Sequence, residues 1–99
     1  MAVHACTTEA TAEVDLWVAR DEMGDLESGV HRVVSDVDGA GNVEVTDITD
    51  VTPRATDIRV TATVRFRTDE RDPDAVRETL VEGFGVMDAT VLVAEALDA

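Results

Sequence analysis

The chain has no lysine and no tyrosine, and its 99 residues include only one cysteine, one tryptophan and two phenylalanines. The single cysteine, Cys6, excludes an internal disulfide and is consistent with a reducing compartment. The longest uninterrupted apolar runs, 16–19 and 91–94, are far shorter than the roughly 20 residues of a membrane-spanning helix. The first residues contain neither a basic leader nor an apolar stretch of signal-peptide length. We therefore expect a cytoplasmic protein that does not span a membrane.

Charge is the most informative feature of the composition. Twenty-two acidic residues face eight basic ones, all of them arginine, and the formal net charge is -14. Such a surface repels itself in dilute buffer, whereas at molar salt the Debye length is only about 3 Å and the repulsion is largely screened. This composition, over the whole chain, resembles that of small acidic cytoplasmic proteins of halophilic archaea. The resemblance implies adaptation to concentrated salt and names no activity.

The apolar residues predict one packed domain. They make up 44% of the chain and recur in periodic patterns, which argues against a disordered acidic coil. Valine and alanine dominate them, with 17 and 13 copies, so we expect a sheet to supply much of the core. We predict an N-terminal extension over residues 1–11 and a single α+β domain over residues 12–97.

The first half of that domain reads as a strand, a helix and a second strand. Apolar residues alternate over 12–18, as in a strand with one buried face. From Met23 to Val37 they recur at spacings of three and four, which predicts a helix capped by Asp21 or Asp25 and ending at Gly39. The apolar pattern of 43–51 then changes parity near Thr46, which indicates a bulged strand.

The second half predicts a strand, a helix and a final strand. Strict alternation over 58–67 is the clearest strand signal, and it should form a hairpin with the preceding strand. Asp72 and Pro73 then provide a helix cap and a first helical residue, and Val76, Leu80 and Phe84 follow at steps of four. Glycines near position 84 end this helix, and 86–97 supplies the last strand.

The order β-α-β-β-α-β matches the ferredoxin-like arrangement, an antiparallel four-stranded sheet with strand order 4-1-3-2 and both helices on one face. The other sheet face is open. Six side chains are predicted to project from it and form a candidate interaction surface: Trp17, Arg59, Thr61, Thr63, Arg65 and Arg67. An exposed tryptophan needs a cover, so we predict a homodimer through this face. The alternative is that neighbouring aliphatic side chains cover Trp17 within one chain.

Arginines gather on one strand of this acidic chain. Arg59, Arg65, Arg67 and Arg71 fall within thirteen residues. Cross-strand ion pairs with Glu13, Asp15 and Glu44 would explain the pattern. The alternative is a site for a small anionic ligand, because guanidinium groups bind phosphate and carboxylate. RNA binding has little support, since bases normally stack on outward aromatic residues of both central strands, and the aromatic residue of strand 58–67, Phe66, faces the core instead.

The sequence contains no catalytic or cofactor motif. Residues 36–47 are partly similar to an EF-hand calcium loop, but Ala40 replaces a ligand and a strand follows instead of a helix, so we interpret the segment as a turn. His4 and Cys6 lack further metal ligands nearby, and His31 lies off the apolar stripe of its helix. We therefore predict no catalytic residue, cofactor or metal, and favour a non-catalytic interaction or regulatory module over an anion binder or an enzyme.

Overall fold

The computed structural model describes residues 8–20 and 24–96. Its element order confirms the predicted β-α-β-β-α-β sequence. The six elements are β1 (Thr8–Ala19), α1 (Leu26–Ser35), β2 (Gly41–Pro53), β3 (Asp57–Thr68), α2 (Pro73–Val81) and β4 (Val86–Ala96). The strands form one antiparallel sheet in the order β2-β3-β1-β4, which is the predicted order read from the other edge. The chain therefore has a ferredoxin-like α+β fold.

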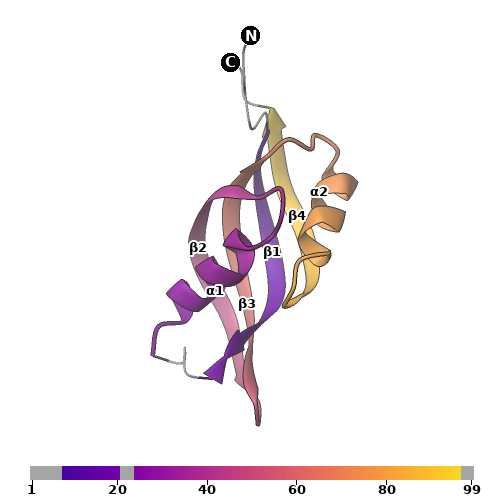
Figure 1. Ribbon diagram of the computed structural model, residues 1–99. Coiled ribbons are helices and arrows are strands. Elements are labelled where there is room, and N and C mark those ends of the chain that lie inside the picture. Colours follow the sequence, from indigo (N-terminus) through magenta and orange to yellow (C-terminus); the bar gives the residue numbers. More distant parts are fainter. Residues whose placement is uncertain (1–7, 21–23, 97–99) are drawn as a thin grey trace.

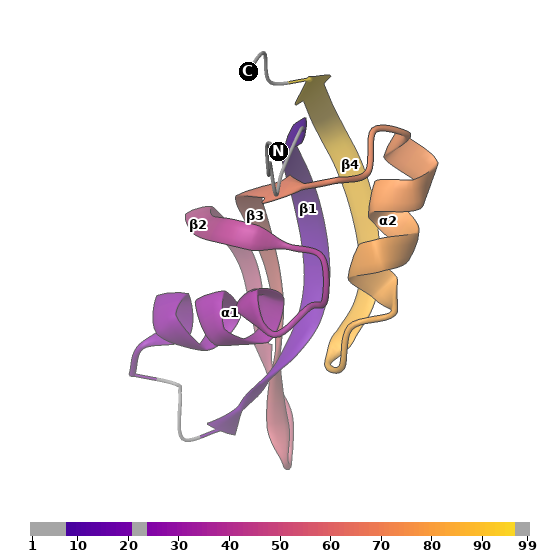
Figure 2. The ribbon, with the colours of Figure 1, turned by 45° about the horizontal axis from the view of Figure 1, so that its top comes forward.

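Both helices lie over the same face of the sheet, α1 towards β2 and α2 along β4 (Figures 1 and 2). Alternate residues of β1 and β3 face the helices and are fully buried, among them Leu16, Val60 and Phe66. Val30 and Val34 of α1 join this core, as do the buried residues of α2. The core lies between sheet and helices, as the alternating pattern predicted, and neither described helix lies on the opposite sheet face. We call that face the open face.

β1 begins earlier than predicted. Thr8, Ala10 and Ala12 are buried and pair in register with the last residues of β3. The predicted N-terminal extension over residues 1–11 is therefore too long, because 8–11 belong to the sheet. Threonine and alanine add little apolar signal at this end of the strand, and only pairing with Phe66 and Thr68 reveals them as strand residues.

The N-cap of α1 is Asp25, one of the two capping residues that the sequence predicted. The Asp25 carboxylate accepts hydrogen bonds from the Ser28 backbone N–H at 3.2 Å and from the Ser28 hydroxyl at 2.8 Å. The alternative cap, Asp21, and the first apolar residue of the stripe, Met23, lie outside the described residues. The helix ends at Ser35, before the predicted Gly39, because the Val37 N–H bonds to the Val34 carbonyl and turns Val37 into the core. Gly39, with φ +99°, then occupies the turn that leads to β2.

The Asp25 cap predicts a pH-dependent contribution to stability. Its hydrogen bonds to Ser28 lower the pKa of the Asp25 carboxyl, so the stabilisation is present above the usual aspartate pKa and is lost as the pH falls below it. We expect Asp25→Ala to weaken amide protection in α1 at neutral pH, with a gap to wild type that closes in acid. Hydrogen exchange followed across this pH range measures the gap. Asp38→Ala removes the same charge from an exposed turn and is the matched control; an equal loss in both variants would contradict the capping role.

β2 is bulged more often than the sequence suggested. Its register with β3 shifts between Val45 and Asp47 and again between Ile48 and Asp50. The extra residues, Thr46 and Thr49, donate their hydroxyl hydrogens to β3 carbonyls at 3.1 and 3.2 Å. Because each bulge adds one residue to β2, the residue after it returns to the sheet face that the pairing with β3 requires. The apolar residues at every third position therefore face the helices, and the acids between them face the opposite side.

α2 has the predicted cap but ends before Phe84. The Asp72 carboxylate accepts a hydrogen bond from the Asp74 N–H at 3.0 Å, and the helix stops at Val81. A side chain at Gly83 would place its Cβ only 2.5 Å from Val37 Cγ2, so only glycine lets the end of α2 pack against the turn after α1. Gly85, with φ +90°, then reverses the chain into β4. Phe84 is turned outward between these glycines, so the step-of-four pattern of Val76 and Leu80 ends before it.

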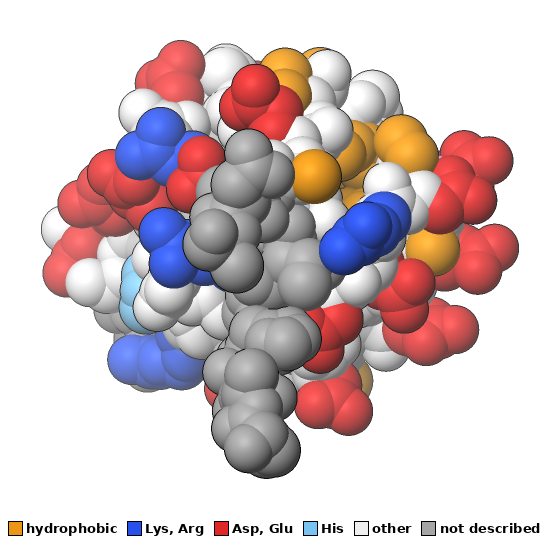
Figure 3. All heavy atoms as spheres, turned by 90° about the horizontal axis from the view of Figure 1, so that it is seen from above, with side chains coloured by type: hydrophobic (Ala, Val, Ile, Leu, Met, Phe, Trp, Pro, Cys, Tyr) orange, Lys and Arg blue, Asp and Glu red, His pale blue; other side chains and the backbone are white. Residues whose placement is uncertain are grey.

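Charged side chains cover much of the surface. Figure 3 views the molecule from above, and acidic side chains are spread around the visible face with a few arginines among them. Hydrophobic side chains gather in one part of this view. Within the described ranges, no helix is long and apolar enough to cross a membrane.

Candidate interaction surface

The open face presents the predicted arginine row between two acidic rows. Arg59, Arg65 and Arg67 are exposed on β3, and Thr61 and Thr63 are half-buried between them. The bulges of β2 place Glu44, Asp47 and Asp50 beside this row. The acids of β1 that flank it on the other side are Glu9, Glu13 and Asp15. The six predicted surface residues therefore lie together on the open face, and acidic side chains of β1 and β2 flank the arginines of β3.

Two of the arginines have acidic partners on neighbouring strands. Arg59 lies 3.9 Å from Asp15, and Arg65 pairs with Glu44. The hydrogen bond and charge of Glu44 raise the pKa of the Arg65 guanidinium. Asp15 also accepts a hydrogen bond from the Thr61 hydroxyl at 2.6 Å. These contacts involve two of the three acids named by the ion-pair interpretation; the third, Glu13, lies opposite Thr63.

Trp17 is half-buried at one end of the open face. The guanidinium of Arg54, from the turn between β2 and β3, lies 5.6 Å from the centre of the indole ring. This distance is within the range of a cation–π contact. Arg20 donates a hydrogen bond to the Arg54 carbonyl and helps to fix that turn. The indole is thus covered in part by its own chain.

A groove of about 540 Å³ lies where β1 runs past the start of β4. The β1–β4 register ends at Leu16↔Val86, so Trp17, Val18 and Ala19 extend beyond the paired part of β4. The residues that line this edge groove are Trp17, Val18, Ala19, Gly29, Arg32, Val33, Asp36, Asp57, Phe84 and Gly85.

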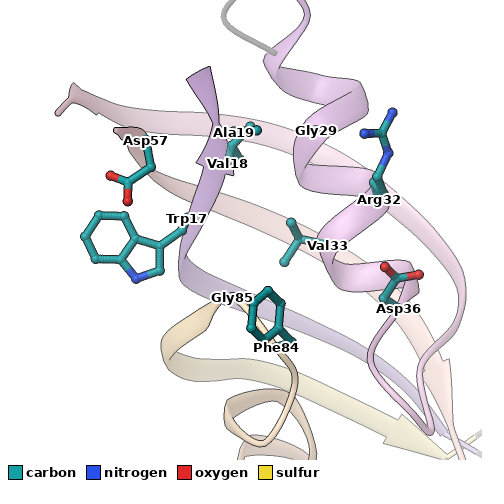
Figure 4. Close-up of a pocket in the computed structure, with 10 residues that line it drawn as sticks. All are labelled: Trp17, Val18, Ala19, Gly29, Arg32, Val33, Asp36, Asp57, Phe84 and Gly85. Carbon is teal, nitrogen blue, oxygen red and sulfur yellow. The ribbon is translucent and has the colours of Figure 1, made fainter. Parts of the chain in front are cut away.

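The walls of the edge groove come from three parts of the fold (Figure 4). Val33 projects from α1 towards the turn that carries Phe84 and Gly85, whereas the Trp17 indole points to the side on which Asp57 lies. Gly29 adds no side chain to the α1 wall, although glycine inside a helix costs about 1 kcal/mol relative to alanine. The groove therefore follows the free edge of β1 from the helical layer towards the open face.

Phe84 stands beside this groove with 98% of its surface exposed. Among the described residues, the next most exposed large apolar side chains are Leu92 at 54%, Val93 at 48% and Val51 at 36%. Burying a phenylalanine side chain is worth about 1.5–3 kcal/mol. Phe84 and the apolar walls of the edge groove therefore form one exposed apolar patch.

The chain was compared with protein-family models, with curated proteins and with solved structures. None of them matches it. The assignment of a site therefore depends on the geometry of the chain itself.

The sequence also offered residues 36–47 and three single side chains as possible metal ligands or catalytic groups. Asp36 follows the last residue of α1 and Asp47 lies on β2, so residues 36–47 form a turn and a strand. His31 is exposed, and its ring lies 3.3 Å from the Ser35 hydroxyl. His4 and Cys6 lie outside the described residues. In the part of the chain that the structure describes, no three His, Cys, Asp or Glu side chains are grouped to hold a metal ion.

Sequence reasoning missed two features of the surface. One is the pair formed by Arg77 and Asp88, 2.8 Å apart, which joins α2 to β4; the Ala89 N–H and this arginine lower the pKa of the Asp88 carboxyl. The other is Phe84. A signal for it was present, because the flanking Gly83 and Gly85 break the helix on which the step-of-four pattern placed it.

Proposed function

We propose that the chain is a non-catalytic interaction module, working as a homo-oligomer or as a subunit of a larger complex, and that it contacts a protein through Phe84 and the edge groove. The observation that carries this proposal is the 98% exposure of Phe84 beside an apolar groove. Aromatic side chains that enter a pocket on a partner supply much of the energy of protein interfaces. The groove lies at the sheet edge, where β1 runs past the paired part of β4, so side chains of a partner protein can reach it.

The charged groups support a scaffold instead of a reaction centre. Three described groups have clearly shifted pKa values, the carboxyls of Asp25 and Asp88 and the guanidinium of Arg65. Each shift comes from a helix cap, a neighbouring backbone N–H or an ion pair at the surface. Catalytic groups are instead shifted by burial in a cleft and by convergent charges.

The arginines of β3 give less support to the alternative of a small anionic ligand or RNA. Asp15 and Glu44 already lie against Arg59 and Arg65, so an incoming anion would compete with carboxylates of the chain. The one aromatic residue at this end of the face, Trp17, has Arg54 over its ring. A row of bases could stack on it only after that contact opens.

The acidic surface supports the proposal that this module works in a salt-rich cytoplasm. In molar salt the repulsion between two copies with a net charge of -14 is largely screened, and apolar contacts decide association. The predicted homodimer through the open face stays a prediction. The acidic rows on β1 and β2 favour the edge groove over that face as the contact between proteins.

Photo-cross-linking tests whether Phe84 meets another protein. Phe84 is replaced by p-benzoylphenylalanine, and the chain is irradiated in cells with a salt-rich cytoplasm. We expect one covalent adduct of defined mass, because the benzophenone keeps the aromatic ring at the same position.

The control places the same group at Leu92, which is 54% exposed on β4. Cross-links from position 92 measure random collisions of an exposed apolar side chain with other proteins. Such collisions involve many proteins, so we expect no single adduct of defined mass. Absence of an adduct at position 84, or equal adducts at both positions, would overturn the proposal.

A further inference from the structure

Phe84 and the edge groove lie side by side on one surface of the molecule. A projecting side chain next to a recess that can receive it is a self-complementary arrangement. When two copies meet across a two-fold axis, the same pair of contacts forms twice, with each chain giving and receiving the same group. We propose that the occupant of the edge groove is Phe84 of a second copy of this chain, so that a symmetric dimer buries both rings; this inference rests on the proposed function above.

The size and chemistry of the groove fit a phenyl ring. An apolar cavity of about 150 Å³ is large enough to bind benzene. The edge groove is larger, about 540 Å³, so it accommodates a ring together with the turn that carries it. Trp17 and Val33, both half-buried, provide apolar surface, and the absence of a side chain at Gly85 allows a close approach of the second copy.

The charges at the rim fit a second copy better than a basic partner. Arg32 and Asp36 lie on the α1 side of the groove, and Asp57 lies on the other side (Figure 4). The groove thus carries both signs, with one arginine and two aspartates, in a chain with a net charge of -14. A strongly basic partner would be drawn more strongly to the acidic rows of β1 and β2.

The contact has a diagnostic salt dependence. Two chains of the same large negative charge repel each other, and this repulsion weakens as the Debye length falls to about 3 Å near 1 M salt. The apolar contact of Phe84 is not screened. Dimerisation through the groove is therefore expected to strengthen as salt rises, whereas association driven by ion pairs would weaken.

Sedimentation equilibrium in about 2 M KCl tests the dimer. Wild type is expected to show a monomer–dimer equilibrium. Phe84→Ala removes the ring, and Ala19→Trp fills the groove from an exposed strand position without touching the core. Each variant should dimerise at least about 10-fold more weakly than wild type, since each loses both copies of an anchoring contact. Leu92→Ala, which removes an exposed apolar side chain elsewhere, should dimerise like wild type.

Mixing the two variants identifies the contact. The Ala19→Trp chain keeps Phe84 and the Phe84→Ala chain keeps an open groove, so one of the two contacts is restored in a mixed dimer. A Phe84→Ala chain labelled at Cys6 should therefore sediment as a dimer when excess Ala19→Trp chain is added, and remain monomeric with excess Phe84→Ala chain. Circular dichroism of each variant confirms that it is folded.

Three outcomes overturn the inference. They are a wild-type chain that stays monomeric throughout, variants that dimerise like wild type, and a mixture that shows no rescue. If the cross-link at position 84 then joins a different protein, the proposed interaction function remains and only the identity of the occupant is wrong. If position 84 gives no adduct at all, both fail.

Discussion

Phe66→Ala is expected to lower the free energy of unfolding by about 3–5 kcal/mol, whereas Phe84→Ala is expected to change it by less than about 0.5 kcal/mol. The two side chains are identical, but Phe66 is 1% exposed and Phe84 is 98% exposed. Phe66 fills the space between β3 and the helices, and its truncation leaves a cavity in a core built mostly of small residues. The 98% exposed ring of Phe84 has almost no intramolecular contact to lose.

Urea unfolding at fixed salt measures both effects, because urea is uncharged and leaves electrostatic screening unchanged. The protein concentration must lie where sedimentation shows monomers, since a dimer adds its own contribution to the apparent stability. A loss of more than about 1 kcal/mol in monomeric Phe84→Ala would mean that the ring packs within its own chain. The exposed aromatic on which the interaction surface depends would then not exist.

Stability is expected to rise with salt. Between about 0.1 M and 2 M KCl, the free energy of unfolding should increase by a few kcal/mol, on a Coulomb estimate for a small sphere with this charge. The cause is the net charge of -14, whose self-repulsion is stronger in the compact state than in the expanded chain. Urea midpoints in a KCl series at constant temperature measure the slope.

A charge-reduced variant separates screening from other salt effects. Asp47→Asn combined with Asp50→Asn removes two exposed charges from β2. This variant should be more stable than wild type at low salt and should gain less from added KCl. Equal stability of the wild type at low and high salt would contradict the proposed adaptation. A slope unchanged in the variant would assign the effect to ion binding or to altered hydration, not to repulsion.

The sheet and the helix starts were predictable because they depend on local patterns. In β3 every second residue is apolar, so only one face of this strand can be buried against the helices. β3 is paired on both sides, with β1 and β2. Asp25 and Asp72 cap their helices through bonds that span only two or three residues. The bulge of β2 near Thr46 was predicted, since the change of parity is itself a local signal, whereas the one between Ile48 and Asp50 was not.

Features that depend on distant contacts were harder to predict. The early start of β1 at Thr8 depends on pairing with the end of β3, and the exclusion of any side chain at Gly83 depends on Val37. No spacing within one helix reports the clash at Gly83, because Gly83 and Val37 belong to different halves of the chain. For the outward turn of Phe84 the flanking glycines are a local signal, but the size of the groove beside it depends on distant elements.

The sequence by itself determined the ferredoxin-like order of elements, the helix-facing side of β1 and β3, the placing of Trp17 and the arginine row on the open face, and the acidic character of the surface. These follow from side-chain periodicity and total charge, which are properties of the chain alone. Only the tertiary structure decided which acids meet Arg59 and Arg65, and only it placed Phe84 in water beside the edge groove. Both outcomes require the relative lengths and packing of elements far apart in the chain, since the groove exists where β1 outruns β4 and α1 approaches the turn after α2.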